Sequence, residues 1–179
     1  RLVDDVDAEC VFERKLHHDV GGGEFGTAEI GMFAKKVLGV ANDAASIDEA
    51  APKILEAICL TLGWEHGALW TVDREMDALR CTEMWTTPSA SFPEFDALSR
   101  RTTFRRGIGL PGRVWAAGEP AWIPDVVLDT NFPRAPVGAR EGLHAAFGFP
   151  VLLRGEVLGV MEFFSREIRE PDEELLAML

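Results

Sequence analysis

Apolar residues recur with helical spacing in two segments of the N-terminal third of the sequence. Within residues 30–38, five apolar side chains follow one another at three- and four-residue intervals, which predicts a first helix. In the second segment, residues 46–49 (Ser-Ile-Asp-Glu) match a capping box, and an apolar face extends from there to Leu62, with Gly63 as the stop. Pro52 predicts that this second helix begins late or kinks.

Short apolar runs farther along the chain predict antiparallel strands. Residues 65–73 and 78–86 flank a four-residue polar turn, and residues 145–153 and 157–165 flank Arg154-Gly155-Glu156, so each pair predicts a hairpin. The segments between the hairpins predict, in order, helical or irregular cover at 88–104, a short helix at 110–117, a brief strand at 121–123 and a helix at 134–142. The sequence therefore predicts an α+β (α/β layered) fold around an antiparallel sheet of five to six strands.

The two ends of the chain differ in composition from its centre. Residues 1–26 are rich in acids and contain three consecutive glycines, which predicts a linker or the tail of a preceding domain. At the other end, Pro171 and the acids after it are typical of a helix N-terminus. Because the apolar run reaches Leu179 with no cap, we expect an exit helix that continues into further protein.

Length and charge narrow the class of protein. A chain of 179 residues, 47% of them apolar and 27% charged, suits one globular domain. No run approaches the roughly 20 apolar residues that span a bilayer, and the first residues are too acidic for a signal peptide, so we expect a cytoplasmic protein. The net charge of −12 disfavours nucleic acid and anionic membranes as partners.

The cysteines carry little chemistry in this pattern. Cys10, Cys59 and Cys81 form no Cys-x-x-Cys pair, and their number is odd. The pattern therefore argues against a disulfide framework and against a four-ligand zinc site.

Three strings in the sequence resemble segments of one domain family. GWEHGALWTVD at 63–73, GIGLPGRVWAAGEPAWIPDV at 107–126 and GLHAAFGFPVLLRGEVLGVMEFFS at 142–165 are similar to GAF domains of multidomain bacterial histidine kinases and cyclases. The resemblance covers roughly residues 46–165. It implies a sensor domain at 27–170, with the terminal helices on one face of the sheet and ligand-pocket loops and short helices on the other. It also implies a homodimer through the terminal helices and a covalently linked output domain after the exit helix at 171–179.

The resemblance further implies a small-molecule pocket between the sheet and the covering loops. Aromatic residues from several predicted elements are the candidate lining, with Phe149 next to them. They are Trp85, Phe95, Phe104, Trp115, Trp122, Phe132, His144 and Phe147. The alternative is that these side chains are simply core, in which case the chain is a pocketless scaffold or dimerisation module.

Known cofactors of the family find little support in the residues. Members that carry a bilin attach it through a cysteine close to a histidine, whereas residues 126–144 hold His144 and no cysteine, so no covalent bilin is expected. A single histidine binds haem in some members, and His144 is the best candidate, but a core or surface histidine is the more ordinary role and haem is not expected. The signature of cyclic-nucleotide-binding members is absent, since Asn131 precedes Phe132 with no lysine. The ligand stays unknown.

An enzymatic branch of the family also bears on the function. Free methionine-(R)-sulfoxide reductase is similar in its glycine turn but uses reactive thiols there, and this chain has Pro111 at that position. We therefore expect a non-catalytic module. A thiol-dependent redox enzyme that uses Cys59 or Cys81 is the remaining alternative.

Five arginines and no acids lie within residues 99–113, in an otherwise acidic chain. Guanidinium groups pair with phosphates and carboxylates, so this arginine cluster could attract an anionic ligand. The alternative is a solvated or ion-paired surface. Likewise, the glycine turn at 107–112 could hold an anion on free N–H groups or could serve only close packing.

Overall fold

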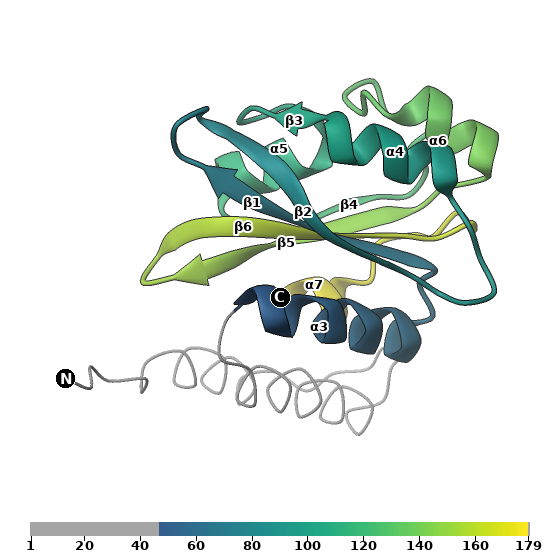
Figure 1. The fold of residues 1–179 in the computed structure, drawn as a ribbon. Helices are drawn as coiled ribbons and strands as arrows, with labels where there is room; N and C mark the ends of the chain where they lie inside the picture. Colours follow the sequence, from purple (N-terminus) through teal and green to yellow (C-terminus); the bar gives the residue numbers. More distant parts are fainter. Residues whose placement is uncertain (1–46, 179) are drawn as a thin grey trace.

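The computed structural model describes residues 47–178, which form a six-stranded sheet with helices on both faces (Figure 1). The elements in chain order are α3 (Ile47–Leu62), β1 (His66–Asp73), β2 (Ala78–Thr86), α4 (Pro93–Arg101), β3 (Thr103–Phe104), α5 (Gly109–Ala117), β4 (Ala121–Ile123), α6 (Ala135–Glu141), β5 (Ala146–Leu153), β6 (Glu156–Phe164) and α7 (Glu173–Met178). The α+β prediction is confirmed. The predicted linker at 1–26 and first helix at 30–38 lie outside the described residues.

The sheet has the strand order β3-β2-β1-β6-β5-β4, and every neighbouring pair is antiparallel. Both predicted hairpins are present, and β1 pairs with β6, so the two hairpins lie side by side at the centre. The sequence did not predict β3, which pairs Phe104 with Leu79 of β2 and thereby extends the sheet by two residues. Short edge strands of this kind expose few unpaired backbone groups.

Helix α3 agrees with its sequence signals at both ends. It begins at Ile47, directly after the predicted capping residue, and runs through Pro52 to Leu62, so the late start that Pro52 predicted does not occur. Gly63 then adopts a left-handed φ of +66°, and the Trp64 N–H donates to the Cys59 carbonyl at 3.0 Å, which is the bond that closes a Schellman motif. None of the described helices is long and apolar enough to cross a membrane.

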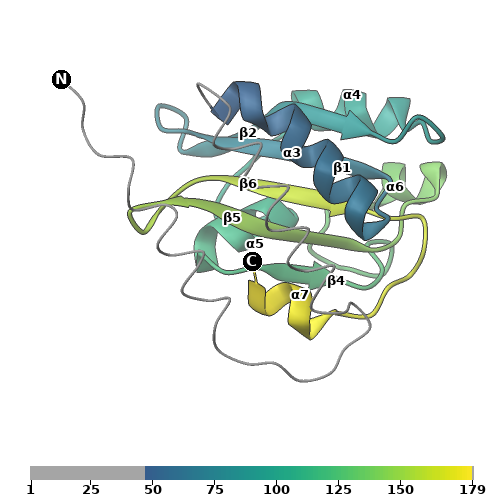
Figure 2. The same ribbon diagram turned by 90° about the horizontal axis from the view of Figure 1, so that it is seen from below.

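The helices divide between the two faces of the sheet, as the family resemblance implied. Figures 1 and 2 show α3 and α7 on one face and α4, α5 and α6 on the other. We call the apolar layer under α4–α6 the upper core; it includes Trp70, Leu79, Phe92, Phe95, Phe104, Leu110, Val114, Trp115, Phe132 and Phe164. We call the layer against α3 and α7 the lower core; it includes Leu55, Ile58, Trp64, Leu69, Phe147, Met161, Phe163 and Leu175.

Alternation along the strands assigns each side chain to one of these cores. In β1, Ala68 and Trp70 belong to the upper core, and Leu69 between them belongs to the lower core. Strands β5 and β6 are covered on both faces along most of their length and are nearly continuous apolar runs, and the one charged residue within the run of β6, Glu162, is buried.

The glycine turn at 107–112, which includes the first residues of α5, requires glycine for steric reasons. Gly109 has a φ of +66°, and a Cβ there would come within 2.8 Å of the Phe104 ring. A Cβ on Gly112 would lie 2.2 Å from the backbone carbonyl oxygen of Arg105, a contact that no real Cβ makes. The close packing of this turn therefore supports the structural interpretation of the glycines.

We predict that Gly112→Ala lowers the free energy of unfolding by about 1–3 kcal/mol or more, because the backbone around Arg105 must move. Gly138→Ala in α6 is the matched control. A Cβ on Gly138 meets its nearest atoms at an ordinary 3.8 Å, and alanine favours the helix over glycine by about 1 kcal/mol. Urea denaturation measures both; equal effects of the two substitutions would contradict the steric argument.

Candidate functional site

The predicted ligand-binding aromatics do not gather in one place. Phe95, Phe104, Trp115 and Phe132 come together in the upper core, where each is at most 4% exposed. They are contributed by α4, β3, α5 and the loop before α6, and they lie on the face of the sheet at which the resemblance implied a pocket.

The other four predicted residues lie elsewhere. Phe147, half-buried Trp85 and half-buried Trp122 belong to the lower core, where the rings of Trp122 and Phe147 stack at 5.4 Å. His144 lies in neither core; its ring Nδ1 is 3.0 Å from an Asp125 carboxylate oxygen, and its side chain is 35% exposed. The prediction that these residues line a single site with the first four is therefore not met.

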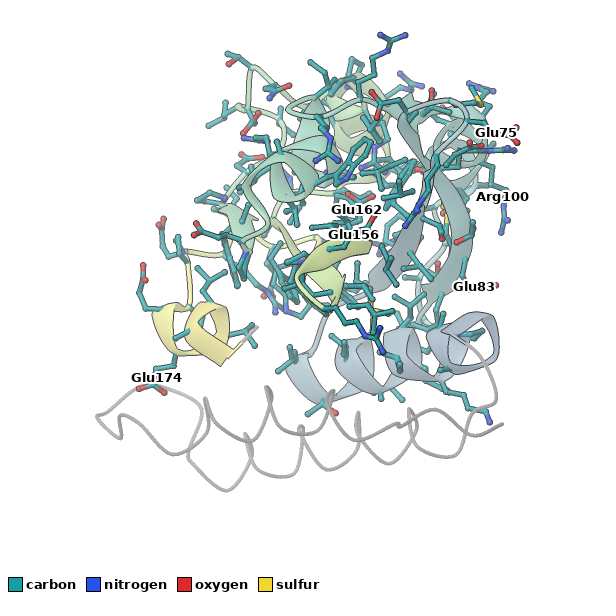
Figure 3. The ribbon with its side chains drawn as sticks, turned by 90° about the vertical axis from the view of Figure 1, so that its left-hand side faces the viewer. Glu75, Glu83, Arg100, Glu156, Glu162 and Glu174 are labelled. Carbon is teal, nitrogen blue, oxygen red and sulfur yellow. The ribbon has the colours of Figure 1, made fainter. Side chains whose placement is uncertain are left out.

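A buried ion pair lies among the four aromatics of the upper core. The Arg134 guanidinium donates through Nη2 to Glu162, with 2.7 Å to Oε1 and 2.8 Å to Oε2, and through Nη1 to the Ser99 hydroxyl at 3.0 Å. Arg134 is 1% exposed and Glu162 is fully buried. In Figure 3 the carboxylate of Glu162 lies inside the molecule, whereas Glu75, Arg100 and Glu174 lie at its periphery.

Two elements far apart in the sequence bring these charges together. Glu162 is near the end of β6, where its Cα is opposite Ala68 of β1 and Gly148 of β5, so its side chain enters the upper core between two small residues. Arg134 directly precedes α6 and reaches down from the covering layer. Glu162 Oε1 also accepts the Trp70 indole N–H at 2.7 Å, which fixes the orientation of the carboxylate.

Aromatic rings enclose the guanidinium on several sides. Its Cζ lies 4.7–5.4 Å from five ring centroids, a range in which cation–π attraction operates. We call these rings the aromatic cage; they belong to Trp70, Phe95, Phe104, Phe132 and Phe164. The site thus consists of one cation, one carboxylate and five aromatic side chains.

The electrostatics of the pair reflect its burial. Loss of water raises the pKa of Glu162 above its usual value, while the charge and hydrogen bonds of Arg134 oppose that rise. An ion pair removed from water gains little net stability over a well-packed apolar pair, but removal of one partner leaves an uncompensated buried charge. The pair is therefore costly to break but contributes little net stability.

A second polar group lies in the same layer. His66 is fully buried against Phe92 and Phe95, its Nδ1 is 2.8 Å from the Thr86 hydroxyl, and its Nε2 is 3.7 Å from Oδ1 of Asp96. Burial, together with the charge of Arg134, lowers the His66 pKa to about 3, so the imidazole is neutral.

Three polar atoms of this region have no hydrogen-bond partner among the described residues. They are His66 Nε2, Asp96 Oδ1 and Arg134 Nε. Buried polar atoms in proteins almost always have a hydrogen-bond partner. Three atoms without one, all close to a charged pair, show that the hydrogen bonding of this layer is incomplete among the described residues.

Sequence reasoning missed this cluster. Glu162 carried a signal, since it is the one charge within the apolar run between Val157 and Phe164, and a carboxylate there must be buried and paired. Arg134 carried none, because it lies between two prolines in a loop with no periodic pattern. Only the tertiary structure joins the two.

The glycine turn and two of the five clustered arginines have partners within the protein. The Gly109 N–H donates to the Asn131 side chain at 3.1 Å, so the turn is capped by the protein itself. Arg113 pairs with Asp129 at 3.0 Å, and Arg106 stacks on Trp115 at 4.0 Å. The other three arginines are exposed, which agrees with the interpretation of the cluster as a solvated surface. They are Arg100, Arg101 and Arg105.

The two described thiols are separated by the sheet and chemically quiet. Cys59 belongs to the lower core on α3, whereas Cys81 packs against the upper core from β2. Burial raises the pKa of each thiol to about 12, which leaves almost no thiolate near neutral pH. Within residues 47–178, no group of three histidine, cysteine or acidic side chains is placed to hold a metal ion.

Comparison with known proteins identifies the fold. Residues 44–179 match the model of a family described as GAF domain. Among solved structures, the GAF domain of a phosphoenolpyruvate-protein phosphotransferase from Coxiella burnetii is 20% identical, with a TM-score of 0.67 and coverage of 84% of each chain. A GAF domain from A. aeolicus in an inactive state is 24% identical, with a TM-score of 0.61 and coverage of 83% of each chain.

An enzyme is also among the similar structures. The free methionine-R-sulfoxide reductase from Neisseria meningitidis, in complex with its substrate, is 18% identical, with a TM-score of 0.66, and the match covers 90% of this chain and 88% of that one. At these identities the similarity concerns the fold alone. No curated protein matches the sequence.

We predict strong coupling between Arg134 and Glu162. Glu162→Gln and Arg134→Met should each lower the free energy of unfolding by about 3–5 kcal/mol, because each leaves one buried charge unpaired. The double variant removes both charges and keeps an amide oxygen for Trp70, so it should lose less than either single variant. Urea denaturation of all four proteins completes the double-mutant cycle; additive losses would show that the pair is not coupled.

We also predict a pH dependence that originates at His66. Between pH 6.5 and about pH 3, the unfolded chain binds a proton at this residue that the folded protein does not bind. The contribution of His66 to the free energy of unfolding is therefore fully present above pH 6.5. It is lost as the pH falls, with a slope of up to about 1.4 kcal/mol per pH unit. His66→Gln should flatten the dependence between pH 5 and 6.5 relative to the native protein, measured by denaturation at each pH. Since lost packing appears equally at pH 8, only a change of slope tests the titration; an unchanged slope would refute it.

Proposed function

Because this chain belongs to the GAF domain family, we propose that it is a non-catalytic sensory or regulatory domain of a cytoplasmic signal-transduction protein, with a small-ligand site in the upper core. The observation that carries the proposal is the charged pair Arg134–Glu162, with the unpaired polar atoms beside it. The pair lies between the sheet and α4–α6, the covered face at which the resemblance implied a pocket.

The polar cluster favours a binding role over simple packing. A layer this rich in aromatics has enough apolar surface to form a core, and an apolar pair of similar volume would serve stability at least as well as Arg134 and Glu162. Buried ionisable groups with displaced pKa values concentrate at functional sites. Glu162 and His66 both have displaced pKa values, and both face the same layer.

The chemistry of the thiols argues against the redox alternative. A thiol that attacks a sulfoxide must be ionised and accessible, whereas Cys59 and Cys81 are largely buried with strongly raised pKa values. Cys59 and Cys81 also lie on opposite faces of the sheet, so they are not placed to form a disulfide with each other. Pro111 is buried in the first turn of α5 and supplies no nucleophile.

A pocketless scaffold is the second candidate, and one observation favours it. Phe95, Phe104, Trp115 and Phe132 are almost completely buried within the upper core, and Arg134 occupies the space among several of these rings. In that case the domain would act through assembly alone. Homodimerisation through residues 30–38 and the helix from 171 onward stays a prediction, which light scattering at high micromolar concentration decides.

Ligand screening distinguishes a sensor from a scaffold. We expect thermal unfolding of the full chain to shift upward with at least one member of a panel of cationic, anionic and neutral metabolites, because binding to the folded state stabilises it. The double variant Arg134→Met/Glu162→Gln is the matched control and should lose that shift, since it alters the polar cluster alone. If no compound in any of the three classes stabilises the native protein, and no absorbance appears between 350 and 700 nm, the scaffold is correct.

A further inference from the structure

We propose that the aromatic cage and Glu162 form a receptor for a small organic cation of the guanidinium type, and that Arg134 is its resident occupant, which such a ligand displaces. The proposal rests on the proposed ligand-binding function and adds the chemical class of the ligand. It follows from the groups that surround Arg134 and from the way in which Arg134 is held.

The chemistry of the enclosure is that of a cation site. Five ring centroids lie within 5.4 Å of the guanidinium carbon, and one buried carboxylate balances its charge. Aromatic faces attract cations most strongly where water is excluded, and aromatic cages are the usual means of binding organic ammonium groups. The Ser99 hydroxyl, which accepts from Nη1, adds a directional contact suited to a planar group with several N–H donors.

Arg134 occupies this site, but one of its N–H donors has no partner among the described residues. Nη2 serves both oxygens of Glu162 and Nη1 serves Ser99, whereas Nε has no hydrogen-bond partner among residues 47–178. A well-made arginine–carboxylate pair uses two donor nitrogens in parallel. A free guanidinium compound can rotate into that geometry, whereas Arg134 is constrained by its attachment to the chain.

Arg134 belongs to the covering layer and not to the sheet. It directly precedes α6, a helix of seven residues whose other polar contacts are with α4. The Glu141 carboxylate accepts the backbone N–H groups of Glu94 and Phe95, and Arg140 pairs with Glu94 at 2.7 Å. Displacement of Arg134 would therefore release the polar link between β6 and the α4–α6 layer, which gives a ligand a means of changing the outer surface.

An anion is disfavoured at the same position. To pair with Arg134, an anion must draw the guanidinium from Glu162, which leaves two negative groups for one cation inside the protein. A guanidinium compound instead exchanges one cation for another and preserves the charge balance. The net charge of −12 also favours the approach of cations.

The test is a titration of the full chain with ethylguanidinium, followed by the Trp70 indole N–H resonance, since that group donates to Glu162 beside the exchanged cation. N-Ethylurea is the control, because it has the same planar shape without the charge, and succinate tests an anion. We expect a saturable shift with ethylguanidinium and none with the other two. No saturable shift with ethylguanidinium, or an equal one with N-ethylurea, overturns the proposal.

Two variants examine the role of the occupant. Arg134→Met removes the competitor, so ethylguanidinium should bind with an apparent Kd at least about tenfold lower than in the native protein. Arg134→Met/Glu162→Gln lacks the carboxylate and should bind no ethylguanidinium; binding equal to that of the native protein overturns the proposal. If Arg134→Met does not fold, the native titration and the double variant decide.

Failure of the cation-receptor proposal can be distinguished from failure of the proposed sensor function. A saturable response to succinate, or thermal stabilisation by neutral or anionic metabolites alone, would leave a sensor domain with a different ligand and would overturn the cation receptor. The absence of any hit in all three classes would overturn both.

Discussion

The Arg134 guanidinium and the Glu162 carboxylate neutralise each other in the upper core, where both are almost completely buried. Four elements of the fold position and enclose this pair. Glu162 enters from β6, Arg134 from the segment before α6, Ser99 from α4 and Trp70 from β1. Because a buried charge without its partner costs several kcal/mol, these four elements must hold their positions together. The ion pair therefore couples the covering helices to the centre of the sheet.

The sheet makes this coupling possible. The two hairpins lie side by side through β1 and β6, so the strands that carry Trp70 and Glu162 are the central pair. Helix α3 and α7 cover the opposite face with a conventional apolar core, which contains the stacked rings of Trp122, Phe147 and Phe163. The two faces thus differ: the buried ion pair and His66 lie in the upper core, whereas the lower core consists of apolar side chains and the Cys59 thiol.

This difference bears on how a domain of this family could act as a switch. Arg134 directly precedes α6, and Glu141 at the end of α6 accepts the backbone N–H groups of Glu94 and Phe95, so contacts connect Arg134 to the N-terminus of α4. In the structure described, the layer under α4–α6 is closed by the protein's own side chains. Sensing and scaffolding differ in whether an external group replaces one of those side chains.

The sequence by itself determined the local elements. Periodicity, turn residues and caps located α3, both hairpins, α5 and α6 to within one or two residues, because these signals act over a few neighbouring positions. The three strings at 63–73, 107–126 and 142–165 indicated the family. Pairing across the chain was beyond such signals. Strand β3 forms because Phe104 pairs with Leu79 of β2. The predicted aromatic lining is divided because Phe147 and its cross-strand neighbour Trp122 point to the lower core, whereas Phe104 lies in the upper core. Arg134 and Glu162 are 28 residues apart in the sequence. Only the tertiary structure decides that they form a site, because the fold removes both from water and makes each the counter-charge of the other.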